Sequence, residues 1–439
     1  MADRYWVGGS GTWNTSSTTN WSASPGGGGG ASVPTSVDSV FFDRAATYTV
    51  TLTGALNCLD FNVSAGAVTF SSTGTISIAG SVSITNVTPT WSATGTLTFT
   101  ATTAKTITSN GTTFSCPMTF DGVGGSWQLL SALTTGATRT VTLTNGTLNL
   151  NNFTLTTGLF ASANSNVRTI AFGTGNITTT GTGSVWFVSP ITNLTLTGTP
   201  VVNVNNNTAT ATSIFTGAPT LATAFSFNFV SGTYTLAFLA GNGNAARNVN
   251  FTGFSGTWSA TGAATVFGSL TLSTGMTLTA SASALTFGAT SGTSTITTNG
   301  KTVDFPLTFN GVGGTFEFTD ALTLGSTRAF TVTNGVVKLK NGTTNTVGSF
   351  ATGAGTTQRF LQSTVAGSQA TITDPSGTNA ATYLTVQDIA AAGGATWNAF
   401  AANNNVDAGN NSGWNFGLTP QYAYEYPIEL RSFTERKRF

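Results

Sequence analysis

The chain contains no histidine, and this limits the chemistry that its side chains can perform. Ser-His-Asp and Cys-His nucleophile systems need an imidazole, and most zinc sites use one, so these classes are excluded. Carboxylates remain as candidates, because glycan-cleaving enzymes work with pairs of Asp or Glu side chains. The chain has 14 acidic residues, but none lies between Asp121 and Asp304.

The densest acidic cluster consists of Asp304, Glu317 and Asp320, with Lys301 close in sequence. If neighbouring strands stack, these side chains could approach one another as a catalytic or metal site. The alternative, which we favour, is a polar patch on the outer face. We therefore expect no catalytic residue, no metal site, no cofactor and no enzyme activity.

An internal duplication explains why we favour the structural interpretation. Residues 117–151 begin PMTFDGVGG and align with residues 306–340, which begin PLTFNGVGG, at an offset of 189 positions. The match extends upstream through 107–117 and 296–306. We interpret the body of the chain as two tandem units, residues 46–232 and 233–416.

The two copies exchange their acidic residues. Asp121 aligns with Asn310, and we align Asp60 with Asn250. A catalytic carboxylate could not be replaced by an amide, whereas a polar residue at a corner of the chain could be. The acids are therefore interpreted as interchangeable corner residues.

The cysteines are exchanged as well. We align Cys58 with Asn248 and Cys116 with Phe305. Since the second unit does without them, a disulfide is not needed, and two buried free thiols are expected.

Three short motifs recur in both copies. Arg139 and Arg328 occupy equivalent positions, where a guanidinium could bind corner carbonyl groups or, alternatively, a glycan. GVGG occurs at 122–125 and 311–314, and since no helix follows either copy it predicts a tight corner rather than a dinucleotide site. NGKT at 299–302 has the wrong upstream glycine spacing for a phosphate-binding loop, and its sister reads NGTT.

Composition and periodicity predict an all-β fold. Only 7% of residues are charged, and 53 are glycine, while hydrophobic residues make up 39%. Runs of about five residues alternate apolar with Thr or Ser, which is the period of a strand with one buried face. NG, TG, AG and SG punctuate these runs. A parallel β-helix, a solenoid of stacked turns, is the favoured architecture, with tandem β-sandwiches as the alternative.

The ends of the chain differ from its body. Residues 1–45 contain Trp6, Trp13 and Trp21 around the loop PGGGGG and predict an N-terminal cap. Trp397 and Trp414 predict a cap at the end of the second unit. Caps are expected because the open ends of a solenoid would otherwise pair with other chains.

The last segment, residues 417–439, has no repeat partner and is rich in aromatic and basic residues. We predict an extended tail that docks onto a partner by adding a strand, with a solvated tail as the alternative. The residues expected to carry the docking are Tyr422, Tyr424, Tyr426, Arg431, Phe433, Arg436, Lys437, Arg438 and Phe439.

Charge and hydropathy also bear on partners. The N-terminus MADRYWVGGSGTW lacks a basic segment followed by an apolar one, so we expect no secretory signal. No apolar run of membrane-spanning length is present, so no membrane insertion is expected. The net charge of +1 gives no case for a nucleic-acid partner.

Three stretches resemble a known group of proteins. RYWVGGSGTWNTSSTTNW with ASVPTSVDSVFFD near the start, LTNGTLNLNNFTLTTG in the body and NNVDAGNNSGWNF near the end are similar to Thr/Gly-rich repetitive β-helical proteins of bacteriophages, especially marine ones, and of bacterial adhesins. The resemblance covers about residues 1–416. It implies a fibre, a spike or a capsid-attached appendage, often trimeric, and it brings no catalytic residues.

The resemblance and the missing export signal together predict a virion structural protein, assembled in the host cytoplasm and acting outside the cell. Its expected partners are other virion proteins, reached through the tail, further copies of itself in a homo-oligomer, and host cell-surface polysaccharide. A bacterial surface adhesin fragment is the alternative, and a polysaccharide depolymerase is a third reading.

Overall fold

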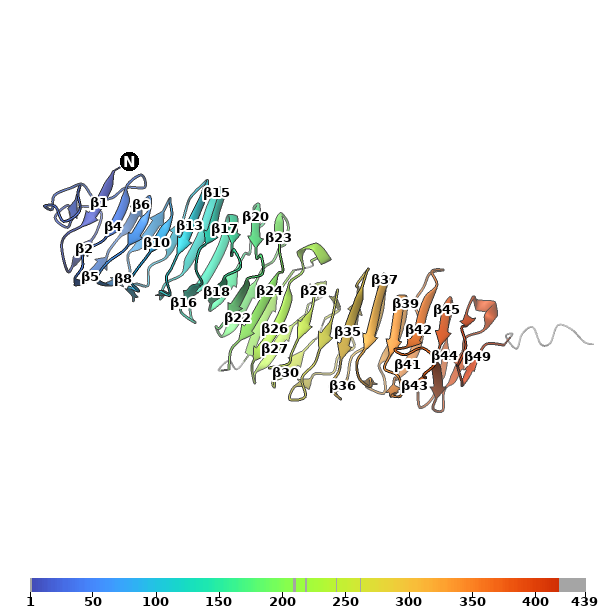
Figure 1. Ribbon diagram of the computed structural model, residues 1–439. Coiled ribbons are helices and arrows are strands. Elements are labelled where there is room, and N and C mark those ends of the chain that lie inside the picture. Colours follow the sequence, from blue (N-terminus) through green and yellow to red (C-terminus); the bar gives the residue numbers. More distant parts are fainter. Residues whose placement is uncertain (1, 208–210, 218, 242, 261, 418–439) are drawn as a thin grey trace, which may run out of the picture. The chain divides into compact units, whose positions relative to one another are not determined.

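The computed structural model describes residues 2–207, 211–217, 219–241, 243–260 and 262–417 (Figure 1). Its strands pair in parallel with the strands one turn before and one turn after. Thr47 pairs with Ala67, 20 residues later, and Asn176 with Val201, 25 residues later. The predicted parallel β-solenoid is confirmed, and the β-sandwich alternative is wrong, because among the described strand pairs only β1 (Asp3–Trp6) and β3 (Trp21–Ser22) are antiparallel.

The chain divides into two compact units. Unit 1 covers Met1–Gly288 and Thr297–Asp304, and unit 2 covers Ala289–Ile296 and the described residues from Phe305 onward. This division follows spatial contacts, whereas the boundary at 232/233 follows sequence correspondence. The predicted tandem units and caps, as domain limits, therefore stay a prediction.

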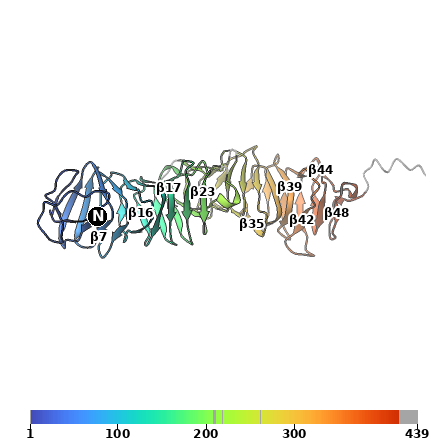
Figure 2. The same ribbon diagram turned by 90° about the horizontal axis from the view of Figure 1, so that it is seen from above.

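The strands of unit 1 form three faces, which the strand pairs define; Figure 2 shows the stacked strands from above. The first face contains β1, β4 (Ser39–Phe42), β7 (Phe61–Val63), β10 (Val82–Ile84), β13 (Ala104–Thr108), the second halves of β15 (Met118–Leu129) and β17 (Thr140–Asn149), β20 (Arg168–Ala171) and β23 (Leu194–Thr197).

The second face contains β6 (Ala55–Cys58), β9 (Thr75–Ile78), β12 (Leu97–Phe99), the first halves of β15 and β17, β19 (Leu159–Ala161), β22 (Gly183–Phe187), β25 (Ala211–Phe215), β27 (Thr235–Phe238), β30 (Thr257–Ser259) and β33 (Thr277–Leu278).

The third face contains β2 (Gly11–Trp13), β5 (Thr47–Leu52), β8 (Ala67–Ser72), β11 (Thr90–Trp91), β14 (Thr113–Phe114), β16 (Leu133–Thr135), β18 (Thr154–Thr157), β21 (Asn176–Thr179), β24 (Val201–Asn205), β26 (Ser226–Ser231), β29 (Val249–Asn250) and β32 (Leu270–Thr271). The remaining elements of unit 1 are β28 (Asn244–Ala246), β31 (Ala264–Val266), β34 (Leu285–Phe287), β36 (Thr302–Val303) and the 3-10 turn η1 (Leu221–Thr223).

Unit 2 is built in the same way. One row contains the first halves of β37 (Leu307–Phe318) and β39 (Ala329–Leu339), then β41 (Ser349–Thr352), β44 (Thr378–Ala380), β47 (Thr396–Asn398) and β49 (Trp414–Asn415). A second contains β35 (Thr293–Thr297), the second halves of β37 and β39, β42 (Arg359–Ser363), β45 (Leu384–Gln387) and β48 (Val406–Asp407). A third contains β38 (Thr323–Leu324), β40 (Thr344–Thr346), β43 (Ala370–Thr373) and β46 (Ile389–Ala392), and η2 (Ala401–Asn403) is a 3-10 turn.

Alternation within each strand separates core from surface. In β5 the side chains of Tyr48, Val50 and Leu52 are buried, and the threonines between them are not. Aromatic rings stack along the core from one turn to the next, as Phe99 does on Phe120 at 4.6 Å. The strands thus bury a continuous apolar core and present Thr and Ser to solvent. Helices would need charged residues on their outer faces, and this sequence has few.

On the third face of unit 1, parallel register lines up outward residues into one row. Their backbones lie about 4.8 Å apart from turn to turn, as in any sheet. The row, which we call the Thr/Asn ladder, consists of Thr49, Thr69, Thr90, Thr113, Thr134, Thr156, Thr178, Asn203, Asn228, Asn250 and Thr271. None of these side chains is buried, and none is charged.

Tryptophan clusters lie in the first and in the last described turns of the chain. In unit 1 the indoles of Trp6 and Trp13 each lie 5.2 Å from that of Trp21, edge to face, and all three are buried. In unit 2 the rings of Trp397 and Trp414 are 5.1 Å apart. These clusters fill the core where stacked turns run out.

The duplicated GVGG motif forms a bulge inside a long strand. β15 and β37 have the same length and the same alternation of buried and exposed residues, and the register of each shifts at its GVGG. Gly122 packs so closely on the preceding turn that a Cβ there would collide with the carbonyl oxygen of Ala101. Gly311 meets Ala289 in the same way. The predicted tight corner is therefore a β-bulge that requires glycine.

Replacing Gly122 by alanine should destabilise unit 1. The added Cβ must displace the backbone of the turn below, and overpacking of this kind costs about 1–3 kcal/mol. Urea unfolding followed by circular dichroism measures the loss. Gly28→Ala is the control, since a Cβ at Gly28 has nothing within 4 Å. Equal stability of the two variants would contradict the close packing of the bulge.

Candidate functional site

The predicted docking residues of the tail, Tyr422, Tyr424, Tyr426, Arg431, Phe433, Arg436, Lys437, Arg438 and Phe439, lie outside the described residues. The docking role therefore stays a prediction.

The acidic cluster does not form a metal site in the described part of the chain. No group of three or more Asp, Glu, Cys or His side chains there is arranged to hold an ion. Glu317 stands in register with Thr295 on one side and Lys338 on the other, on the outward face of β37. A carboxylate beside a lysine on a half-exposed sheet surface needs no further partner, which supports the interpretation of Glu317 as part of a polar patch.

The exchange of acid for amide at one corner has a simple structural basis. In unit 1 the amide nitrogen of Asn145 donates to Asp121 Oδ1 at 2.7 Å. In unit 2 the amide nitrogen of Asn334 donates to Asn310 Oδ1, also at 2.7 Å. Only an acceptor oxygen is needed at this corner, and Asp and Asn both supply one.

A second exchange corrects the sequence alignment. Asp60 Oδ1 accepts the backbone N–H of Ser81, and Asn248 Oδ1 accepts that of Ser269 in the same way. Asp60 therefore corresponds to Asn248, not to Asn250. The alignment of Cys58 with Asn248 was wrong by the same two positions, because alternating strands look alike after a shift of two residues.

Both cysteines are buried and free, as predicted. Burial raises the pKa of the Cys58 thiol far above its ordinary value, and the nearby Asp60 adds to this. Burial likewise raises the pKa of Cys116, to about 12. Both side chains are therefore protonated, inert core residues at neutral pH.

The arginines that bind corner carbonyls are a pair whose role the sequence did not reveal. Arg168 is 1% exposed and Arg359 is 0% exposed. The Arg168 guanidinium donates to Ser162 Oγ at 2.6 Å and to the carbonyls of Asn166 and Thr192 at 3.0 and 2.7 Å. It thereby ties the loop before β20 to the loop of the next turn.

Arg359 binds the carbonyls of its own preceding loop in unit 2. Its guanidinium donates to the carbonyls of Gly353, Gly355 and Thr357. Burial lowers the pKa of both arginines, yet backbone oxygens surround the charge and solvate it. The sequence suggested that Arg139 binds corner carbonyl groups, but Arg168 and Arg359 do so instead. The Arg139 side chain is half-exposed, and its guanidinium has no hydrogen bond within the described part of the chain. Spacing offered one clue, since Arg168 and Arg359 align loosely between the copies.

The NGKT segment is a turn. Asn299 and Gly300 both have positive φ, 50° and 72°, and the backbone N–H of Lys301 closes the turn on the carbonyl of Thr298 at 3.1 Å. The sister pair, Asn110 and Gly111, has φ of 45° and 76°. Both copies of the segment are therefore tight turns that use an Asn-Gly pair with positive φ.

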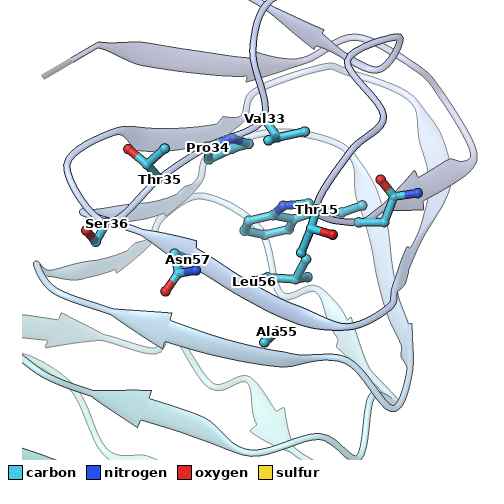
Figure 3. Close-up of a pocket in the computed structure, with 10 residues that line it drawn as sticks. Thr15, Val33, Pro34, Thr35, Ser36, Ala55, Leu56 and Asn57 are labelled. Atoms are coloured by element: carbon cyan, nitrogen blue, oxygen red, sulfur yellow. The ribbon is translucent and has the colours of Figure 1, made fainter.

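A cleft of about 300 Å³ in unit 1 is a further candidate for ligand binding (Figure 3). Figure 3 shows Val33 and Pro34 on one wall and Leu56 and Asn57, from β6, on the facing wall. The buried Trp13 indole, which is 1% exposed, also lines the cleft. The sequence had assigned this tryptophan only to the cap.

Much of the polar chemistry around this cleft is already used by the protein. Asn14 Oδ1 accepts the backbone N–H groups of Ser16 and Ser17. The backbone N–H and the hydroxyl of Thr35 both donate to Asp38 Oδ2, at 3.1 and 2.6 Å. Burial alone would raise the pKa of Asp38, but these bonds, one from Ala2 and the charge of Arg4 outweigh it and lower the pKa.

The cleft is therefore a fixed, uncharged recess lined in part by apolar side chains. Its free polar groups at the rim include the Asn57 amide and the Ser36 hydroxyl. Such a recess can hold a small neutral molecule with one apolar face, and none of its lining residues is charged.

Comparison of the chain with protein-family models, with curated proteins and with solved structures finds no match. Within the described residues, no helix has the length and apolar character needed to span a membrane. What the protein does must therefore be argued from its sequence and its fold.

Replacing Arg168 by methionine should destabilise the protein strongly. The change leaves several buried carbonyl oxygens without a donor, and each such group costs about 1–3 kcal/mol. We expect a loss of about 3 kcal/mol or more in the free energy of unfolding, measured by urea titration. Arg139→Met serves as the control and should change stability little. A small effect of Arg168→Met would show that water replaces the guanidinium.

Proposed function

We propose that the protein is a structural component of a bacteriophage virion: a fibre, spike or capsid-decorating appendage that contacts glycans of the host surface. The observation that carries this proposal is the in-register stacking of turn upon turn. Such a β-helix fits fibres, spikes and adhesins in general, because each turn is hydrogen-bonded to the next and shares one core.

The chemistry of the surface supports the same role. The outward Thr/Asn ladder is neutral over eleven turns, so copies crowded on one particle would repel one another little. Hydroxyl and amide groups are also suited to contact with sugar hydroxyls. The sequence resemblance over residues 1–416 points to virion and adhesin proteins, and the aromatic and basic tail supplies a segment for attachment.

No catalytic step is part of the proposal. The protein would act passively, as a stiff element that assembles in the host cytoplasm and meets its ligand outside the cell. A homotrimer is the favoured assembly. Neither nucleic acid nor a membrane is among the proposed partners.

Mass spectrometry of purified virions tests the proposal. Gradient-purified particles from an infected culture should contain peptides from the whole length of the chain. Particles that lack them would refute the virion role and favour the bacterial adhesin, whose gene would encode a secretion signal or domain upstream. Halos on host lawns that disappear in Asp304→Asn or Glu317→Gln variants would instead favour a polysaccharide depolymerase.

Deletion of residues 421–439 tests the predicted docking tail. The truncated protein should keep its β circular dichroism and its unfolding midpoint, since the solenoid core lies in residues before the tail. It should fail to enter the particle when it replaces the full-length protein during infection. Normal incorporation of the truncated protein would refute docking through the tail.

A further inference from the structure

The first GVGG bulge forms part of a groove in unit 1. The groove has a volume of about 580 Å³ and is lined by residues from four successive turns. Val123 comes from the bulge of β15, Asn145 from β17, Asn166 and Val167 from the loop before β20, and Asn193 from the loop before β23. Its size suits one or two sugar rings, within the range of ordinary ligand sites.

Glycine keeps the floor of the groove open. Gly146 has φ of 79°, and a Cβ there would lie 2.6 Å from the carbonyl oxygen of Gly125. Gly125 itself packs on Ala101 of the preceding turn, where a side chain would collide. The floor is therefore bare backbone, so a ligand can approach the sheet more closely here than over the threonine rows.

Two valines stand at the rim. Val123 is 76% exposed and Val167 is 75% exposed, and these are the most exposed large hydrophobic side chains in the described residues. Isolated exposed valines are common, but two that line one groove offer apolar surface to the same ligand. On the Thr/Asn ladder, by contrast, the outward positions carry only Thr and Asn.

Three asparagines present fixed acceptors. The amide nitrogens of Asn145, Asn166 and Asn193 donate to Asp121 Oδ1, the Thr144 carbonyl and the Ser165 carbonyl, at 2.7, 3.1 and 2.9 Å. Among the described residues no donor reaches the oxygen atoms of these three amides. Each amide is thus held by its nitrogen and keeps its oxygen for a hydroxyl or N–H group of a ligand.

The groove is also rigid and neutral. Arg168 lines it, but its guanidinium is buried and bonded to the carbonyls of Asn166 and Thr192, so it braces the two loops that carry Asn166, Val167 and Asn193. The Asp121 carboxylate, which holds Asn145, lies beside the bulge and balances the charge of Arg168. The groove therefore favours a neutral ligand rich in hydroxyl donors over an acidic one. Preorganised loops lower the entropy cost of binding.

We propose that this groove binds a neutral oligosaccharide, whose hydroxyl groups donate to the asparagine amides while its C–H face packs on Val123 and Val167. The inference rests on the proposed function in that the host surface would supply the glycan. It adds the place and the class of ligand: an uncharged sugar, bound without cleavage.

Unit 2 contains an incomplete copy, which serves as an internal control. Val312 is 61% exposed on the second bulge, and Asn334 is held by Asn310 as Asn145 is held by Asp121. The position before Arg359, however, is Gln358, whose amide nitrogen donates to Thr385 Oγ1 at 2.8 Å. The second valine is missing there, so binding is expected in unit 1 alone.

Binding of the full-length protein to an array of neutral and acidic oligosaccharides tests the inference, followed by calorimetry on the best neutral glycan. Val123→Thr with Val167→Thr keeps the side-chain volumes and should weaken binding about tenfold, which corresponds to about 1.4 kcal/mol. Val312→Thr should leave the affinity unchanged. Circular dichroism checks that the exposed substitutions leave the fold intact.

A blank array, a preference for acidic glycans, or equal effects of the two valine variants would overturn the inference. These outcomes are separate from the virion test. A protein found in particles but blank on the array refutes the groove and not the virion role. A protein that binds neutral glycans through Val123 and Val167 but is absent from particles refutes the virion role alone.

Discussion

The structure depends on one constraint: each strand must hydrogen-bond in parallel and in register with the strands of the turns before and after it. Each turn satisfies the backbone N–H and C=O groups of its neighbours, whether the paired residues are 20 positions apart, as Thr47 and Ala67 are, or 25, as Asn176 and Val201 are. Register also fixes which side chains meet. It stacks Phe99 on Phe120 inside and lines up Thr156 with Thr178 outside.

Where the backbone departs from this pattern, specific residues hold it. Glycine makes the two GVGG bulges possible, because nothing larger fits between Gly122 and the turn below. Arg168 and Arg359 supply donors to the loop carbonyls that lie outside the ladder of backbone bonds. The groove of unit 1 lies between the GVGG bulge and the loop that Arg168 holds. Its shape therefore follows from these two departures from regular strand stacking.

The small number of charged side chains also bears on function. Only 7% of the residues are charged, and Asp121 and Asp60 serve as hydrogen-bond acceptors at corners. What remains for recognition is shape, amide and hydroxyl groups, and a few exposed apolar side chains. These are the means by which proteins bind neutral, hydroxyl-rich ligands.

The sequence by itself determined the solenoid, the duplication and the free buried thiols, because period-two alternation and a repeat are local patterns that chain order displays. It predicted a corner at GVGG but not that Val123 and Val167 would face one groove. It placed Asp60 opposite the wrong asparagine, since alternation tolerates a shift of two residues. Only the tertiary structure decided which arginines are buried and which side chains from four separate turns meet, because stacking register, not spacing along the chain, sets those distances.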